Sequence, residues 1–162
     1  MNYFELFSLP ERPIIDRSIL SKRFFELQRK FHPDYHTDDT ENEQLDILEL
    51  SSAVNKAYSI FKDDQKTIAY YLQLKGFLEE EEKYNLPADF LMEMMEVNEW
   101  LDDGEIAKVK ALIADTEAQM DLRFHQIVAD PAGKIAESDI LKIKDYYFRK
   151  KYLRRILDRL ND

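Results

Sequence analysis

The sequence contains no cysteine and only three glycines among 162 residues. The lack of cysteine excludes disulfide bonds, thiol catalysis and metal sites built on thiolates. Because tight hairpins and phosphate-binding loops use glycine heavily, its scarcity disfavours a β-sheet protein and a nucleotide-binding loop. A net charge of −10 argues against nucleic acid as the main partner, since duplex binding requires neutralisation of phosphates. The composition therefore predicts an acidic, all-α protein.

Long apolar runs are also missing, since no stretch approaches the ~18–20 residues needed to cross a bilayer. The N-terminal sequence MNYFELFSLPERP lacks the basic and then apolar pattern of a secretory signal. We therefore expect no membrane partner and a location in the bacterial cytoplasm, with the mitochondrial matrix as the alternative.

The apolar residues that are present recur at intervals of three and four, which is typical of amphipathic helices. The pattern predicts a helix over 17–31 and a second long helix, into which the acidic stretch 38–49 leads and which ends near 62. In the second long helix, Leu45 and Leu48 are expected in the core. Further helices are predicted over 65–74, 88–102, 105–129 and 137–160. A run of four glutamates at 79–82 separates two groups of helices. We therefore predict an N-terminal helical module (1–76), a linker (77–87) and a three-helix bundle (88–162).

A His32-Pro33-Asp34 triplet ends the first long helix. Proline disfavours the helical conformation of the preceding residue, so the triplet should form a turn that presents an imidazole and a carboxylate outward. The helix before it has a basic face with a local charge of +3, against one glutamate, Glu26. The basic residues of this face are Lys22, Arg23, Arg29 and Lys30. Such a face is either a solvated surface or one that steers the chain toward an acidic partner, with Asp34 pairing with an arginine there.

Metal binding is the alternative explanation for the histidines. His32 and His36 are four residues apart with Asp34 nearby, which is the residue content of a metal-dependent hydrolase. However, Pro33 breaks the helix that would place both imidazoles on one side, and no third ligand follows at zinc-like spacing. We predict no metal and no cofactor.

A second group of candidate residues lies in the segment DFLMEMMEVNEWL at 89–101. At helical spacing one stripe forms the core, comprising Phe90, Met94, Val97 and Leu101. A second apolar patch, comprising Leu91, Met92 and Met95 with Glu96 and Glu99 beside it, points elsewhere. Because a bundle helix needs only one buried stripe, the second is either covered by a neighbouring helix or is a docking surface. On the last helix, Phe148 and Tyr152 also point away from the core, and they either extend this surface or pack on the linker.

Several segments together resemble a J-domain, the module that docks on DnaK-type heat-shock-70 chaperones and stimulates their ATP hydrolysis. They are NYFELFSLP (2–10), SKRFFELQRKF (21–31), HPD (32–34), NKAYSIFKD (55–63) and TIAYYLQLKG (67–76). Tyr35 stands where a basic residue usually follows the aspartate. The segment FLMEMMEVNEWLDD (90–103) resembles the hallmark segment of the HscB family, the co-chaperones of iron–sulfur cluster assembly, and the resemblance covers nearly the whole chain.

This resemblance implies an L-shaped, non-enzymatic co-chaperone made of a J-domain and a three-helix bundle. Its HPD triplet and basic face would bind a DnaK/HscA-type chaperone. Leu91, Met92, Met95, Glu96, Glu99 and Tyr152 would bind the scaffold protein IscU. Tyr152 is assigned from the segment KYLRRI (151–156), with Phe148 as the other candidate. A J-protein with a different client is the alternative function, and the lack of a cysteine-bearing zinc region favours the bacterial type.

Overall fold

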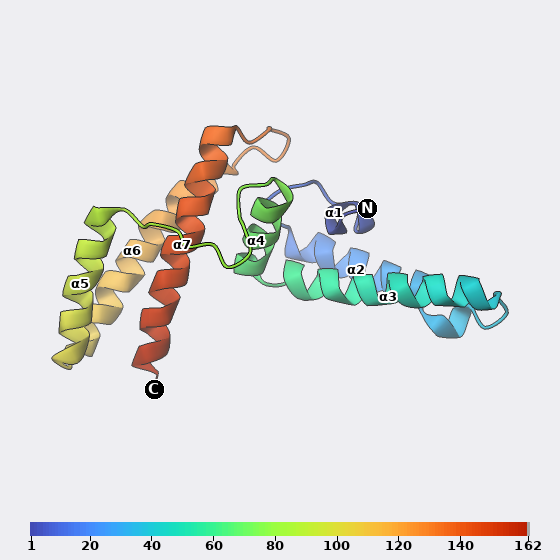
Figure 1. The fold of residues 1–162 in the computed structure, drawn as a ribbon, viewed down its shortest axis with the longest axis horizontal. Helices are drawn as coiled ribbons and strands as arrows, with labels where there is room; N and C mark the ends of the chain where they lie inside the picture. The colour runs from blue at the N-terminus through green and yellow to red at the C-terminus, as the bar shows by residue number, and fades with distance from the viewer. Residues whose placement is uncertain (162) are drawn as a thin grey trace. The chain divides into compact units, whose positions relative to one another are not determined.

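The computed structural model describes residues 1–161, which form helices and connecting segments without a β-strand. The chain divides into two compact units, one from Met1 to Leu74 and the other from Lys75 onward. The expectation of an all-α fold is confirmed (Figure 1).

The first unit is built around a hairpin of two long helices. It contains α1 (Tyr3–Leu6), α2 (Arg17–Phe31), the short 3-10 helix η1 (Pro33–Tyr35), α3 (Glu41–Phe61) and α4 (Asp64–Leu74). Helices α2 and α3 run side by side in opposite directions (Figure 1). The Asp16 carboxylate caps α2 by accepting hydrogen bonds from the amides of Ser18 and Ile19. At the other end of α2 the chain turns through η1 and enters α3 at a capping box formed by Thr40 and Glu43.

Aromatic side chains dominate the core of this unit. Phe4 and Phe7 of the N-terminal segment pack on Phe61, and the rings of Phe24 and Tyr58 stack with centroids 3.8 Å apart. These contacts join α1 and α2 to the C-terminal half of α3. The aromatic core therefore lies toward the end of the hairpin opposite η1.

One expectation about α3 was wrong, because Leu45 and Leu48 are exposed. The stripe of buried residues Phe61, Ala57 and Val54 continues toward the N-terminus of the helix through Leu50 and Ile47, which are half-buried. Leu45 and Leu48 lie on a neighbouring stripe, and α2 covers only one of the two.

The second unit is a three-helix bundle of α5 (Ala88–Asp102), α6 (Ile106–Ile127) and α7 (Glu137–Leu160), with neighbouring helices antiparallel (Figure 1). Gly104, whose φ of +76° favours glycine, forms the turn after α5. The core contains the predicted stripe of α5, packed against residues of α6 and α7: Phe90, Met94, Val97, Val109, Ile113, Leu153 and Ile156.

The segment before α5, within the range predicted as a linker, packs on α7. Glu82 pairs with Lys144 at 2.7 Å, and Tyr84 stacks on Phe148 with ring centroids 4.5 Å apart. The Tyr84 hydroxyl also donates a hydrogen bond of 2.8 Å to Asp145. Burial and this carboxylate together raise the pKa of Tyr84 to about 12. The chain therefore enters α5 from an anchored position on α7.

Candidate functional site

His32, Pro33 and Asp34 form an exposed turn, which we call the HPD corner. His32 has extended backbone angles (φ −72°, ψ 130°), as expected for a residue before proline, and it caps η1. Its Nδ1 accepts a hydrogen bond of 3.2 Å from the Asp34 amide, and the Asp34 carboxylate lies 3.6 Å from the same nitrogen. The two side chains are 53% and 86% exposed, so the predicted outward presentation is confirmed.

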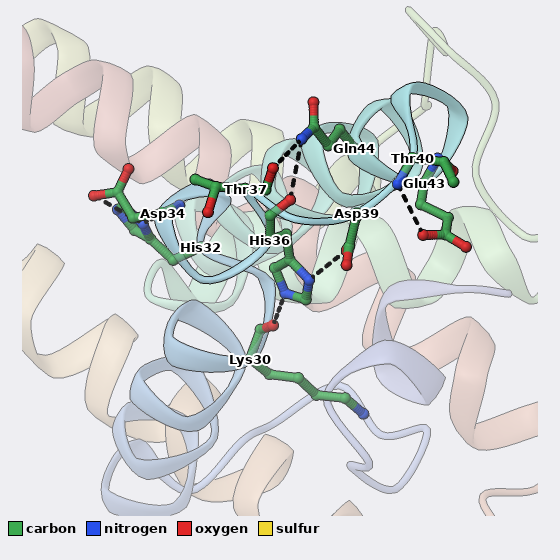
Figure 2. Close-up of polar contacts among 9 residues, drawn as sticks. All are labelled: Lys30, His32, Asp34, His36, Thr37, Asp39, Thr40, Glu43 and Gln44. Carbon is green, nitrogen blue, oxygen red and sulfur yellow. Dashed lines mark hydrogen bonds and ion pairs between the residues drawn. The ribbon is translucent and has the colours of Figure 1, made fainter.

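A second set of polar contacts is made by the residues that follow the HPD corner in the chain (Figure 2). The His36 ring bonds through Nε2 to the carbonyl oxygen of Lys30 and through Nδ1 to the Asp39 carboxylate, both at 2.8 Å. The Gln44 amide donates to the carbonyls of His36 and Thr37. Sequence reasoning considered His36 only as a metal ligand. Its partners lie three and six residues away across a turn, and helical periodicity does not predict contacts across a turn.

The basic face of α2 keeps most of its charge on the surface. Lys22, Arg29 and Lys30 are exposed, whereas Arg23 is half-buried and lies 3.7 Å from Glu26. The cations therefore reach solvent along the helix that leads to the HPD corner.

An aromatic depression adjoins the HPD corner, and sequence reasoning missed it. Phe25 and Tyr35 are both exposed there, and they line the depression together with Gln28, Arg29, His32 and Asp34. The adjacent Phe24 and Phe25 could have signalled it, because two successive helix residues point about 100° apart and only one of them can face the core.

The second candidate surface is on α5, and we call it the α5 patch: Leu91, Met92, Met95, Glu96 and Glu99. All five residues are exposed, whereas Phe90, Met94 and Val97 of the same helix are buried. The patch is therefore an apolar surface beside carboxylates that neither α6 nor α7 of the same unit covers.

Tyr152 and Phe148 of α7 have different surroundings. Tyr152 is half-buried and packs against the bundle core, so the expectation that it points away from the core was wrong. Its ring lies edge-on to Phe90, and its hydroxyl accepts a hydrogen bond of 3.4 Å from Asn98. Asn98 follows Met95 by three residues, so Tyr152 borders the side of α5 that carries the patch. Phe148 is covered by Tyr84. The structure thus brings Tyr152 toward the α5 patch, whereas Phe148 packs on the segment before α5.

The geometry offers little support for the metal-dependent alternative. Within residues 1–161, no three histidine, aspartate or glutamate side chains gather closely enough to hold an ion. Both ring nitrogens of His36 already have protein partners. Over the same residues, no helix combines the length and the apolar character needed to span a membrane.

An exposed HPD corner at the end of a two-helix hairpin, followed by a helical bundle, places the chain among the J-domain proteins. Comparison with known families narrows this class. The family described as the HSCB C-terminal oligomerisation domain matches residues 86–161. Co-chaperone protein HscB homologs from strains of Vibrio cholerae serotype O1, M66-2 among them, are 32% identical over 158 residues. The match covers 96% of this chain and 92% of theirs, and the chain therefore belongs to the HscB family of co-chaperones.

Solved structures agree with this assignment. Chaperone HscB from Vibrio cholerae is 30% identical with a TM-score of 0.64, over 99% of this chain and 96% of that one. The human co-chaperone protein HscB, at 22% identity, shares the fold with a TM-score of 0.77, over 99% of this chain and 81% of that one.

Proposed function

We propose that this protein stimulates the ATPase of a DnaK/HscA-type heat-shock-70 chaperone and delivers the scaffold protein IscU to it during iron–sulfur cluster assembly or transfer. The observation that carries the proposal is the presence of two exposed surfaces of different chemistry on separate units, the HPD corner and the α5 patch.

The HPD corner and the basic face suit a transient partner with an acidic surface. Asp34 can pair with an arginine of the chaperone, while Lys22, Arg29 and Lys30 steer the encounter. An exposed ion pair contributes about 0.2–1 kcal/mol and is screened by salt. The complex should therefore be weak and salt-sensitive, as suits a protein that must leave after each ATPase cycle.

The α5 patch suits a client protein. Methionine side chains are flexible and polarisable, so Met92 and Met95 can adapt to a partner surface, and Glu96 and Glu99 favour a partner with cations nearby. A client held on this unit while the HPD corner engages the chaperone raises the effective concentration of one partner near the other. Delivery then requires no chemistry on this chain, and with no cysteine the chain lacks thiolates to hold the cluster.

Steady-state ATPase rates of candidate chaperones, measured with and without IscU, test the proposal. The wild-type protein should raise the rate, and IscU should raise it further. His32→Gln should abolish both effects, whereas the double variant Leu91→Ala/Met95→Ala should keep the basal stimulation and lose the IscU-dependent part.

The alternatives give different results in the same series. A J-protein with another client would stimulate the chaperone, and the double variant would bind IscU as the wild type does. A metal-dependent hydrolase would contain stoichiometric zinc or manganese after purification.

A further inference from the structure

His36 makes two short hydrogen bonds to groups that can only accept. Nε2 lies 2.8 Å from the Lys30 carbonyl oxygen, and Nδ1 lies 2.8 Å from Oδ2 of Asp39 (Figure 2). A neutral imidazole has one N–H and could serve only one of them. With the Asp39 carboxylate ionised, both bonds form together only when each ring nitrogen carries a proton, which is the imidazolium form of His36.

This cation lies at the end of α2, where a positive charge is stabilising. The Lys30 carbonyl is among the last of the helix, which ends at Phe31, so it has no partner within α2. The imidazolium supplies that partner and also opposes the negative end of the helix dipole. His36 thus acts as a side-chain cap that belongs to the segment after the HPD corner.

The far side of the same segment is held by α3. The Gln44 amide donates to the His36 carbonyl at 3.2 Å and to the Thr37 carbonyl at 3.0 Å. The His36 backbone amide closes η1 by donating to the Pro33 carbonyl at 3.0 Å. Residue 36 is therefore bonded to the helix before the corner, to the corner itself and to the helix after it.

We propose that His36 is the positioning residue of the HPD corner: as an imidazolium bonded to the Lys30 carbonyl and Asp39, it holds the corner in the conformation that engages the chaperone. The effect on the chaperone rests on the function proposed above. The pair of hydrogen bonds from His36 to the Lys30 carbonyl and to Asp39, which we call the His36 clamp, is a property of this chain itself.

The charged groups around His36 determine how the protonation of its ring, and so the clamp, depends on pH. Asp39 is the carboxylate in contact with the His36 ring. Two further carboxylates have other partners: that of Asp34 lies near His32, and that of Glu43 accepts from the Thr40 amide. The Lys30 ammonium extends away from the ring (Figure 2). The hydrogen bonds to the Lys30 carbonyl and to Asp39 raise the pKa of His36 above its ordinary 6.5. Because the folded-state pKa is the higher one, the clamp is complete below pH 6.5 and is lost as the pH rises through the raised pKa.

An NMR titration of the full chain tests the clamp without a partner. The His36 ring should titrate above 6.5, and the backbone amide of Tyr35 should shift with the same midpoint, because it donates to the His32 carbonyl inside the corner that His36 holds. Asp39→Asn should lower the His36 pKa, whereas Asp38→Asn, the same charge change one residue away, should leave it near the wild-type value. A His36 pKa at or below 6.5, a Tyr35 amide that does not follow it, or equal effects of the two variants would overturn the clamp.

Chaperone ATPase stimulation then tests the positioning role. If loss of the clamp leaves the corner competent about a fifth of the time, His36→Gln raises the concentration for half-maximal stimulation about fivefold. As the pH rises from below 6.5 through the raised pKa of His36, the wild-type advantage over His36→Gln should disappear because the ring deprotonates. A variant indistinguishable from the wild type at low pH would refute positioning. Failure of the wild type to stimulate any chaperone would instead refute the proposed function, and the NMR titration would still decide the clamp.

Discussion

Two adjacent methionines of α5 should separate folding from client binding. Met94 is fully buried in the bundle core, whereas Met95 is 64% exposed in the α5 patch. Replacing a buried methionine by alanine removes its packing and leaves a cavity, which costs about 2–5 kcal/mol. For a unit of this size each kcal/mol lowers the melting temperature by about 4–8 °C, so Met94→Ala should lower it by at least about 8 °C.

Met95→Ala should leave the melting temperature nearly unchanged, because surface substitutions usually alter stability by less than about 0.5 kcal/mol. Its effect should instead be on IscU binding. A central interface side chain contributes about 1–2 kcal/mol, which corresponds to a dissociation constant about 5–30 times larger. Thermal melts followed by circular dichroism and calorimetric titration with IscU measure the two quantities. Equal destabilisation by both variants, or unchanged IscU affinity in Met95→Ala, would refute the assignment of the two faces.

Three further predictions follow from individual contacts. His32→Gln should abolish chaperone stimulation while leaving the melting temperature unchanged, because the side chain is exposed. Tyr84→Phe should cost about 0.5–1.5 kcal/mol by removing the bond to Asp145, measured by urea unfolding. Since the pKa of Tyr84 is raised to about 12, the wild type should also lose stability between pH 10 and 12 more steeply than Tyr84→Phe. Although burial raises the pKa of Asp121, hydrogen bonds from a tyrosine hydroxyl and from Lys150 lower it overall. Its stabilisation should therefore be present above pH 3.8 and lost as the pH falls through the lowered pKa, and acid melts of Asp121→Asn should lack this loss.

Helix positions and the two exposed surfaces were predictable from local sequence. The helices 88–102 and 137–160 begin and end where their periodicity and turn residues predicted. Pro33 placed the HPD corner outside α2, and the excess apolar residues of α5 indicated the patch. Each of these features depends on neighbours within a few residues, which is the range that periodicity and turn chemistry report.

Contacts between distant segments could not be read in this way. Packing of Phe148 on the linker was one of two alternatives, but nothing in the sequence indicated Tyr84 as its partner. The ion pair of Glu82 with Lys144 joins residues about 60 positions apart, and a run of glutamates gives no sign of a partner at that distance. The error at Leu45 and Leu48 has a similar origin, because two apolar stripes on one helix are equivalent until the packing partner is known. The structural role of His36 was missed because one of its partners is the backbone carbonyl of Lys30. Every residue has such a carbonyl, so the sequence does not indicate which one a histidine will contact.

The hydrogen bond within the HPD corner also determines which atoms a partner meets. Because Nδ1 of His32 accepts from the Asp34 amide, the proton of the neutral ring is on Nε2. The corner thus presents an N–H donor on the ring beside an acceptor on the Asp34 carboxylate. A complementary surface must carry these groups in reverse, an acceptor opposite the imidazole and a donor opposite the acid, so recognition depends on the order of the two side chains as well as on their charge.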